Sequence, residues 1–171
     1  MSRDGVVRGS KRVIRLNPAV ETSAYANADV LFHSLEIPRA VIEKGGCSKL
    51  ISGFLVCEGA DVPIGYLVFS EKTLTLGTVN ATADVSHANF ITANPLATIY
   101  TDGNVDTDSA IDNVNMRQFY GKSTGAEEFS LPVLLQADTD STSVYVGMIA
   151  DQSGITFDNT DSLQVILHIE D

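Results

Sequence analysis

Two stretches in the last third of the chain restrict the fold more than any other feature of the sequence. In both stretches, 142–150 and 162–169, apolar residues recur at every second position, which is the period of a β-strand. The apolar residues that share one face of each strand are Val144, Val146, Met148, Ala150, Leu163, Val165, Leu167 and Ile169. Two such strands can be buried only against other strands, so the rest of the chain must supply them.

Further strands are expected at short spacing along the chain, separated by Gly, Pro, Asn and Asp. We expect them at 11–16, 30–37, 48–57, 64–70, 95–100 and 129–136, the last interrupted by Pro132. The segments 48–57 and 64–70 are the most apolar part of the chain and are expected to form a central hairpin. The segment 74–79 is either a short strand or an irregular crossing.

Helical periodicity is almost missing from the sequence. The best candidate for a helical turn is 82–90, with Thr82 or Asp84 as its N-cap, and 21–29 is expected to be a loop held by Tyr25. The pattern predicts an all-β fold, an antiparallel β-sandwich that is jelly-roll-like and has an extended N-terminal arm. The expected division is 1–16, a basic arm with the first strand, and 17–171, a single sandwich domain.

The charge of the chain is unevenly distributed. The net charge is −11, but residues 1–15 contain one acid, Asp4, and five basic residues, so this segment carries +4 and the remainder −15. The candidate partner-binding residues are therefore Arg3, Arg8, Lys11, Arg12 and Arg15. An acidic body disfavours nucleic acid, whereas a short basic arm can dock on an acidic partner; the alternative is a frayed terminus without a role.

The N-terminal sequence predicts a protein that is made and kept in a cytosol, or in a particle assembled there. No apolar run approaches the roughly 20 residues of a membrane helix, and 1–12 lacks the apolar region of a signal peptide. Cys47 and Cys57 would lie about 33 Å apart on the same face of one regular strand, so they are not expected to pair. We expect both to be small buried residues, with a redox or intermolecular role as the alternative.

One acidic segment resembles part of a calcium-binding loop. Asp102, Asn104 and Asp106 occupy the first, third and fifth positions of that loop pattern. Thr107 stands where the pattern needs glycine, and Asn113 where it needs a bidentate glutamate. The three residues are weak metal candidates, and a solvated loop is the main expectation.

The sequence contains no catalytic motif. The histidines are scattered, and the chain has no nucleophile elbow, phosphate-binding loop or dinucleotide-binding glycine pattern. Because there is no Trp, a sugar-binding face is less expected than usual. We predict that the protein is not an enzyme and needs no cofactor.

Several of these segments, taken in order, resemble a family of phage proteins. The segments are 21–31 with its Thr-Ser-Ala-Tyr, the apolar strand after Gly45-Gly46, Tyr66-Leu67-Val68-Phe69, 144–149 and 161–167. Together they resemble the small β-rich head decoration or cement proteins, or head-fibre-like proteins, of tailed bacteriophages, over about residues 20 to 170. The sequence departs from that pattern at 27–29, which lacks a glycine before the Asp, and at 70–72, which lacks an acidic end.

The resemblance implies a structural virion protein on the outer surface of a capsid, synthesised in the host cytoplasm. Its partners would be the major capsid protein, whose subunits it would bridge, and neighbouring copies of itself in a dimer or trimer, with no nucleic acid and no membrane. The alternative is a glycan- or receptor-binding β-sandwich module on a virion. That alternative predicts an exposed aromatic cluster and a cation near 102–108.

Overall fold

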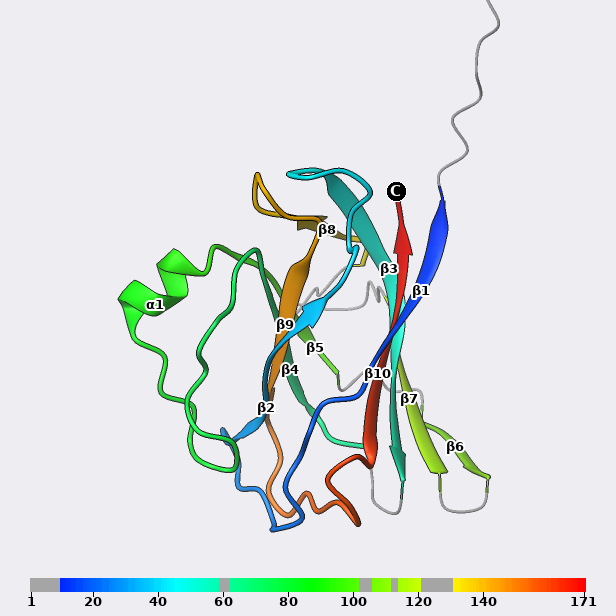
Figure 1. The fold of residues 1–171 in the computed structure, drawn as a ribbon. Helices are drawn as coiled ribbons and strands as arrows, with labels where there is room; N and C mark the ends of the chain where they lie inside the picture. Colours follow the sequence, from blue (N-terminus) through cyan, green and yellow to red (C-terminus); the bar gives the residue numbers. More distant parts are fainter. Residues whose placement is uncertain (1–9, 59–61, 102–105, 112–113, 121–130) are drawn as a thin grey trace, which may run out of the picture.

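The computed structural model describes residues 10–58, 62–101, 106–111, 114–120 and 131–171 (Figure 1). This part of the chain forms ten strands and one short helix. In chain order they are β1 (Lys11–Leu16), β2 (Val30–Ile37), β3 (Cys47–Glu58), β4 (Gly65–Ser70), α1 (His87–Thr92), β5 (Pro95–Tyr100), β6 (Asp106–Ile111), β7 (Val114–Tyr120), β8 (Val133–Gln136), β9 (Val144–Ala150) and β10 (Leu163–Glu170).

The strands form two antiparallel sheets that face one another (Figure 1). The large sheet has the order β1-β10-β3-β7-β6, with β8 also paired to β3, and the small sheet has the order β2-β9-β4-β5. Apolar side chains from both sheets meet in one core, which includes Leu55 and Leu167 from the large sheet and Phe69 and Val146 from the small one. Each such side chain contributes about 1.5–3 kcal/mol when fully buried. The predicted all-β, antiparallel class is confirmed.

The two closing strands occupy central positions in different sheets. β9 lies between β2 and β4, and β10 lies between β1 and β3. Along β10, Leu163, Val165, Leu167 and Ile169 all have no exposed surface, while the intervening residues are half-buried. The alternation in the sequence therefore predicted both the strands and their buried faces correctly.

The expected hairpin of 48–57 with 64–70 is wrong. β3 belongs to the large sheet and β4 to the small one, so the chain changes sheets between them. One edge of β3 is paired with β10 and the other with β7 and β8, which leaves no edge for β4. A short connection between β3 and β4 is compatible with a hairpin in one sheet and with strands in two different sheets. Strands later in the chain determine which of the two forms, because they pair with both edges of β3.

A bulge reverses the faces of β3 near its middle. Ser52 is opposite His168 and Leu50 is opposite Ile169, so Ile51 is an extra residue on β3. Cys57 is consequently buried, whereas Cys47 is exposed, and the two do not form a disulfide with each other. The expectation that the two cysteines share one buried face is wrong because it assumed an unbroken period of two.

Several local expectations can also be compared with the structure. The helix α1 begins later than expected and is capped by Ser86, whose Oγ accepts the amide of Asn89 at 3.2 Å, so neither Thr82 nor Asp84 is its cap. The 74–79 segment is irregular, and β8 begins only after Pro132. β6 starts at Asp106, inside the segment expected to be a solvated loop.

The loop held by Tyr25 is confirmed. The Tyr25 ring is 1% exposed and packs edge to face on Phe157, with ring centroids 5.8 Å apart. Its hydroxyl accepts the amide of Glu21 at 2.7 Å and donates to the carbonyl of Leu31 at 3.4 Å. Burial raises the pKa of Tyr25 above its ordinary value, because the charged form loses its hydration.

Candidate functional site

The outward face of the small sheet is covered by the chain that connects β4 to β5. Leu74 and Leu76 from this connection are buried against Val30 and Val68 of the sheet, and Ala93 completes the cluster. In Figure 1 the connection and α1 lie outside the layer formed by β2, β9, β4 and β5. This face is therefore occupied by the protein itself.

Backbone contacts hold the connection against the sheet. The amide of Val30 donates to Ala81 at 3.0 Å, and the amide of Asn80 donates to Val30 at 2.9 Å. At Gly147 on β9, a β-carbon would lie 2.6 Å from Cδ1 of Leu76, so a larger residue would displace that side chain. The glycine thus allows the connection to lie close to β9.

The outward face of the large sheet differs in both packing and charge. Val13 is 52% and Leu134 is 56% exposed, while Phe54, Val56 and Ile166 are half-buried on the side opposite the core. Lys11, Arg15 and Lys49 lie on the same side, and all three are exposed. We call this set of residues, together with Ser52, His168 and Glu170, the large-sheet face.

Register brings the residues of the large-sheet face together from distant parts of the chain. Ser52 Oγ is hydrogen-bonded to Nδ1 of His168 at 2.8 Å, and the His168 ring packs edge to face on Phe54 with centroids 5.5 Å apart. The Lys11 ammonium lies 3.9 Å from Glu170, in an exposed pair that adds little stability. The face thus has an apolar centre with basic residues around it.

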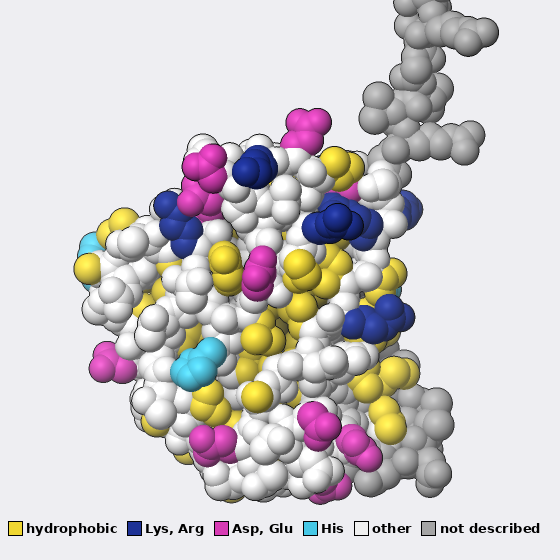
Figure 2. All heavy atoms as spheres, viewed as in Figure 1, with side chains coloured by type: hydrophobic (Ala, Val, Ile, Leu, Met, Phe, Trp, Pro, Cys, Tyr) yellow, Lys and Arg dark blue, Asp and Glu magenta, His cyan; other side chains and the backbone are white. Residues whose placement is uncertain are grey.

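The predicted partner-binding residues fall into three groups. Arg3 and Arg8 lie outside the described residues, whereas Lys11 and Arg15 are exposed on the outward side of β1. Figure 2 shows Lys and Arg side chains along the side of the molecule where β1 runs. The structure therefore places Lys11 and Arg15 where a partner can reach them.

Arg12, in contrast, is used inside the molecule. Its guanidinium donates to the backbone carbonyls of Arg39 and Ala40 and to the carboxylate of Asp171. Arg39 adopts a positive φ of 54°, which is unusual for a residue with a β-carbon. Arg12 therefore ties the turn after β2 to β1 and to Asp171.

A groove runs beside Arg12 at the edge of the two sheets. Its volume is about 510 Å³, and it is lined by Arg12, Arg39, Val41, Ile42 and Thr142. Ile42 is 62% exposed, so the groove offers both apolar and cationic surface. No sequence motif predicted it, because β1 and the 38–42 turn meet only through tertiary packing.

The weak metal candidates are not brought together by the structure. Asp102 and Asn104 lie outside the described residues, and Asp106 is the first residue of β6. Within the part of the chain that the structure describes, no three or more His, Cys, Asp or Glu residues gather as a metal site would require.

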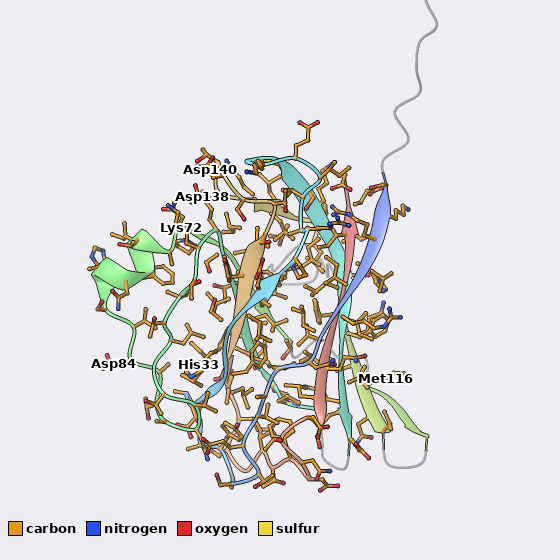
Figure 3. The ribbon with its side chains drawn as sticks, in the orientation of Figure 1. His33, Lys72, Asp84, Met116, Asp138 and Asp140 are labelled. Carbon is orange, nitrogen blue, oxygen red and sulfur yellow. The ribbon has the colours of Figure 1, made fainter. Side chains whose placement is uncertain are left out.

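Outside the large-sheet face, one ion pair shifts a pKa. A hydrogen bond from Lys72 lowers the pKa of Asp138, and the two charged groups are 3.2 Å apart. Figure 3 shows the two side chains near one another, away from β1 and β10. This pair stabilises the loop after β8 and does not belong to the large-sheet face.

Comparison with known proteins does not assign this surface. A scan against protein-family models found no match, and searches of curated proteins and of solved structures found none either. Among the described residues, no helix has the length and apolar content needed to cross a membrane.

Proposed function

We propose that this chain is a structural virion protein of jelly-roll-like architecture that decorates or cements the capsid of a tailed bacteriophage. The observation that carries the proposal is the strand order. If β6 and β8 are set aside and the remaining eight strands are renumbered along the chain, the sheets have the orders 1-8-3-6 and 2-7-4-5. This nested order is expected for a jelly roll, an architecture common in viral capsid proteins and also in lectins.

The two outward faces support attachment through the large sheet. The small sheet is already covered, whereas the large-sheet face combines Phe54, Val56 and Ile166 with three exposed basic residues. An apolar centre with a charged rim is the usual composition of a protein interface. Because the chain as a whole carries −11, a basic face also orients the protein on an acidic surface.

In this proposal the large-sheet face binds the outer surface of the shell across neighbouring major capsid subunits. A specific interface buries about 800 Å² on each partner, which the face of a six-stranded sheet can supply. Arg3 and Arg8, which lie outside the described residues, would add two positive charges to the segment that begins the chain. The acidic remainder of the molecule would face the solvent.

The experiment is incorporation of a tagged copy into phage particles. A tagged chain is expressed in infected cells, and its copy number in purified particles is compared with that of the variant K49E/L134E. The matched control, K44E/I91E, places the same two carboxylates at exposed residues outside the large-sheet face. We expect a loss of at least tenfold for K49E/L134E and none for the control.

Two results would count against the proposal. If the unaltered tagged chain is missing from purified particles, the virion assignment is wrong. If K49E/L134E is incorporated as well as the control, attachment does not use the large-sheet face.

A glycan- or receptor-binding module is the second candidate, and one aromatic pair favours it. Tyr66 and Tyr100 lie on β4 and β5 with ring centroids 4.9 Å apart, and the Tyr66 hydroxyl donates to Asp151 at 3.4 Å. Both rings are half-buried, and Tyr100 comes two residues before the acidic 102–108 segment in the chain. Binding of glycans that is lost in Y100A and in the presence of a chelator would support this function over capsid attachment.

A further inference from the structure

The helix α1 stands outside the packed layers of the protein. None of its six residues is buried, although Leu74, Leu76 and Ala93 on either side of it pack on the small sheet. Phe90 is 39% and Ile91 is 55% exposed. Isolated helices shorter than about 12–15 residues are marginal in water, and most helical stability in proteins comes from packing of an apolar face. We call these two side chains the α1 projection, and the described part of the chain leaves them uncovered.

The groove beside Arg12 is a concave surface with an apolar lining. Its volume is about 510 Å³, and its apolar residues are Val41, which is buried, and Ile42, which is 62% exposed. Hydrogen bonds fix its walls, since the Arg12 guanidinium donates to the carbonyl of Ala40 at 3.0 Å and the amide of Val41 donates to Thr142 at 3.1 Å. The groove is therefore formed before any partner binds.

A cationic side chain in the groove favours an aromatic occupant. Arg39 lines the groove and is exposed, and its guanidinium makes no hydrogen bond or ion pair with any residue that the structure describes. A guanidinium is attracted to the face of an aromatic ring. Of the Phe and Tyr side chains whose burial the structure describes, only Phe90 is exposed. The α1 projection therefore matches the groove both in its apolar surface and in its ring.

We propose that the α1 projection of one copy inserts into the groove of a second copy, with Phe90 packed on Ile42 and against the Arg39 guanidinium. Neither the projection nor the groove includes a residue of the large-sheet face. The inference therefore concerns only copies of this chain and does not depend on a capsid. The variant K44E/I91E should lose this contact while its large-sheet face stays intact, so failure of either proposal can be recognised separately.

The other exposed apolar side chains do not offer the same match. Among the described residues, large apolar side chains are exposed at Val13 and Leu134, which lie on the open surface of a sheet, and at Ile42, Phe90 and Ile91. In Figure 1, α1 lies on the opposite side of the molecule from β1, the strand beside the groove, so one copy cannot fill its own groove. The contact joins two different surfaces, which produces a closed ring if the rotation closes and an open chain if it does not.

The first experiment measures the mass of the full chain in solution by light scattering over a wide range of protein concentration. Contacts that bury less than about 1,200 Å² are typically transient, so we expect a mass that rises above 18.3 kDa as the concentration increases. F90S and R39G should stay at 18.3 kDa with unchanged circular dichroism spectra, since Phe90 is exposed and glycine readily adopts the positive φ of Arg39. V13S, an exchange on the large-sheet face, should assemble as the unaltered chain does.

Cross-linking between copies separates the proposed contact from any other. Differently tagged I42C and I91C chains, both carrying C47S to remove the exposed thiol, are mixed and treated with a short bismaleimide. We expect them to be joined at least tenfold more than the control mixture of V13C and I91C, which also pairs two exposed positions. The proposal is overturned if the unaltered chain is monomeric at every concentration. It is equally overturned if folded F90S and R39G keep the mass of V13S, or if the two mixtures cross-link equally.

Discussion

Replacing Leu76 by alanine should lower the free energy of unfolding by about 2–5 kcal/mol, the usual cost of removing a buried leucine side chain. Leu76 is 1% exposed and packs on the outward face of the small sheet. A residue that merely rested on the surface would cost less than about 0.5 kcal/mol. The measurement therefore tests whether the β4–β5 connection is a packed layer.

Gly147, which lies against Leu76, allows a sharper test. In G147A the new β-carbon would lie 2.6 Å from Leu76 but at ordinary distances, 3.4 and 3.5 Å, from the backbone atoms of Ser34 and Phe32. The only severe overlap is therefore with Leu76, and crowding of this kind costs about 1–3 kcal/mol. In the double variant the methyl group enters the space that leucine vacated, so the double variant should be no less stable than L76A alone.

Urea unfolding, followed by circular dichroism, gives the free energies of unfolding of the unaltered chain, L76A, G147A and the double variant L76A/G147A. Together the four values form a double-mutant cycle. Independent sites add within about 0.3–0.5 kcal/mol, whereas the contact predicts a coupling of about 1 kcal/mol or more. Additive effects would refute the packing argument. V13S, on the exposed large-sheet face, is the control and should change stability by less than about 0.5 kcal/mol.

Three further predictions follow from groups outside these surfaces. Y25F should destabilise the fold by about 1 kcal/mol through its lost hydrogen bonds. Because folding raises the pKa of Tyr25, its contribution is complete below pH 10.0 and is lost as the pH rises further, so the unaltered chain should lose more stability than Y25F in alkaline urea titrations. R12M should cost about 1.5–3 kcal/mol in the same assay, since Asp171 and two carbonyls lose a charged donor. A thiol reagent should modify Cys47 in the folded protein and reach Cys57 only after denaturation, as mass spectrometry of labelled peptides would show.

The strands were predictable where one face is buried and the other is not. The alternation in β10 survives in the structure because this strand has the core on one side only. In β9 it survives because the main core lies on one side, while the thinner β4–β5 connection covers the other side and leaves Tyr145 and Ile149 half-buried. The strand β6 was missed because Asp, Ser and Thr give it little strand propensity, and its pairing with β7 is what makes it a strand. The sheet to which β3 and β4 belong depends on partners such as β10, more than 100 residues later, which local pattern does not contain.

The candidate surface was predictable in its charge but not in its extent. Lys11 and Arg15 stand out in the sequence as part of a basic segment in an acidic chain. Lys49, Leu134 and His168 do not, since only the register of β3 with β8 and β10 brings them to one face. One signal was present, because Phe54 and Val56 make β3 apolar on both faces, which is unusual for a strand that faces water.

The pairing of β1 with β10 also has a consequence for synthesis. Arg12 and Asp171 are 159 residues apart in the chain, so β1 leaves the ribosome long before its partner exists. At 5–20 residues per second, this interval lasts about 8 to 30 s. During that time Ile14 and Leu16 have no strand beside them, and the positive charges of the segment would keep nascent chains on neighbouring ribosomes from associating through it.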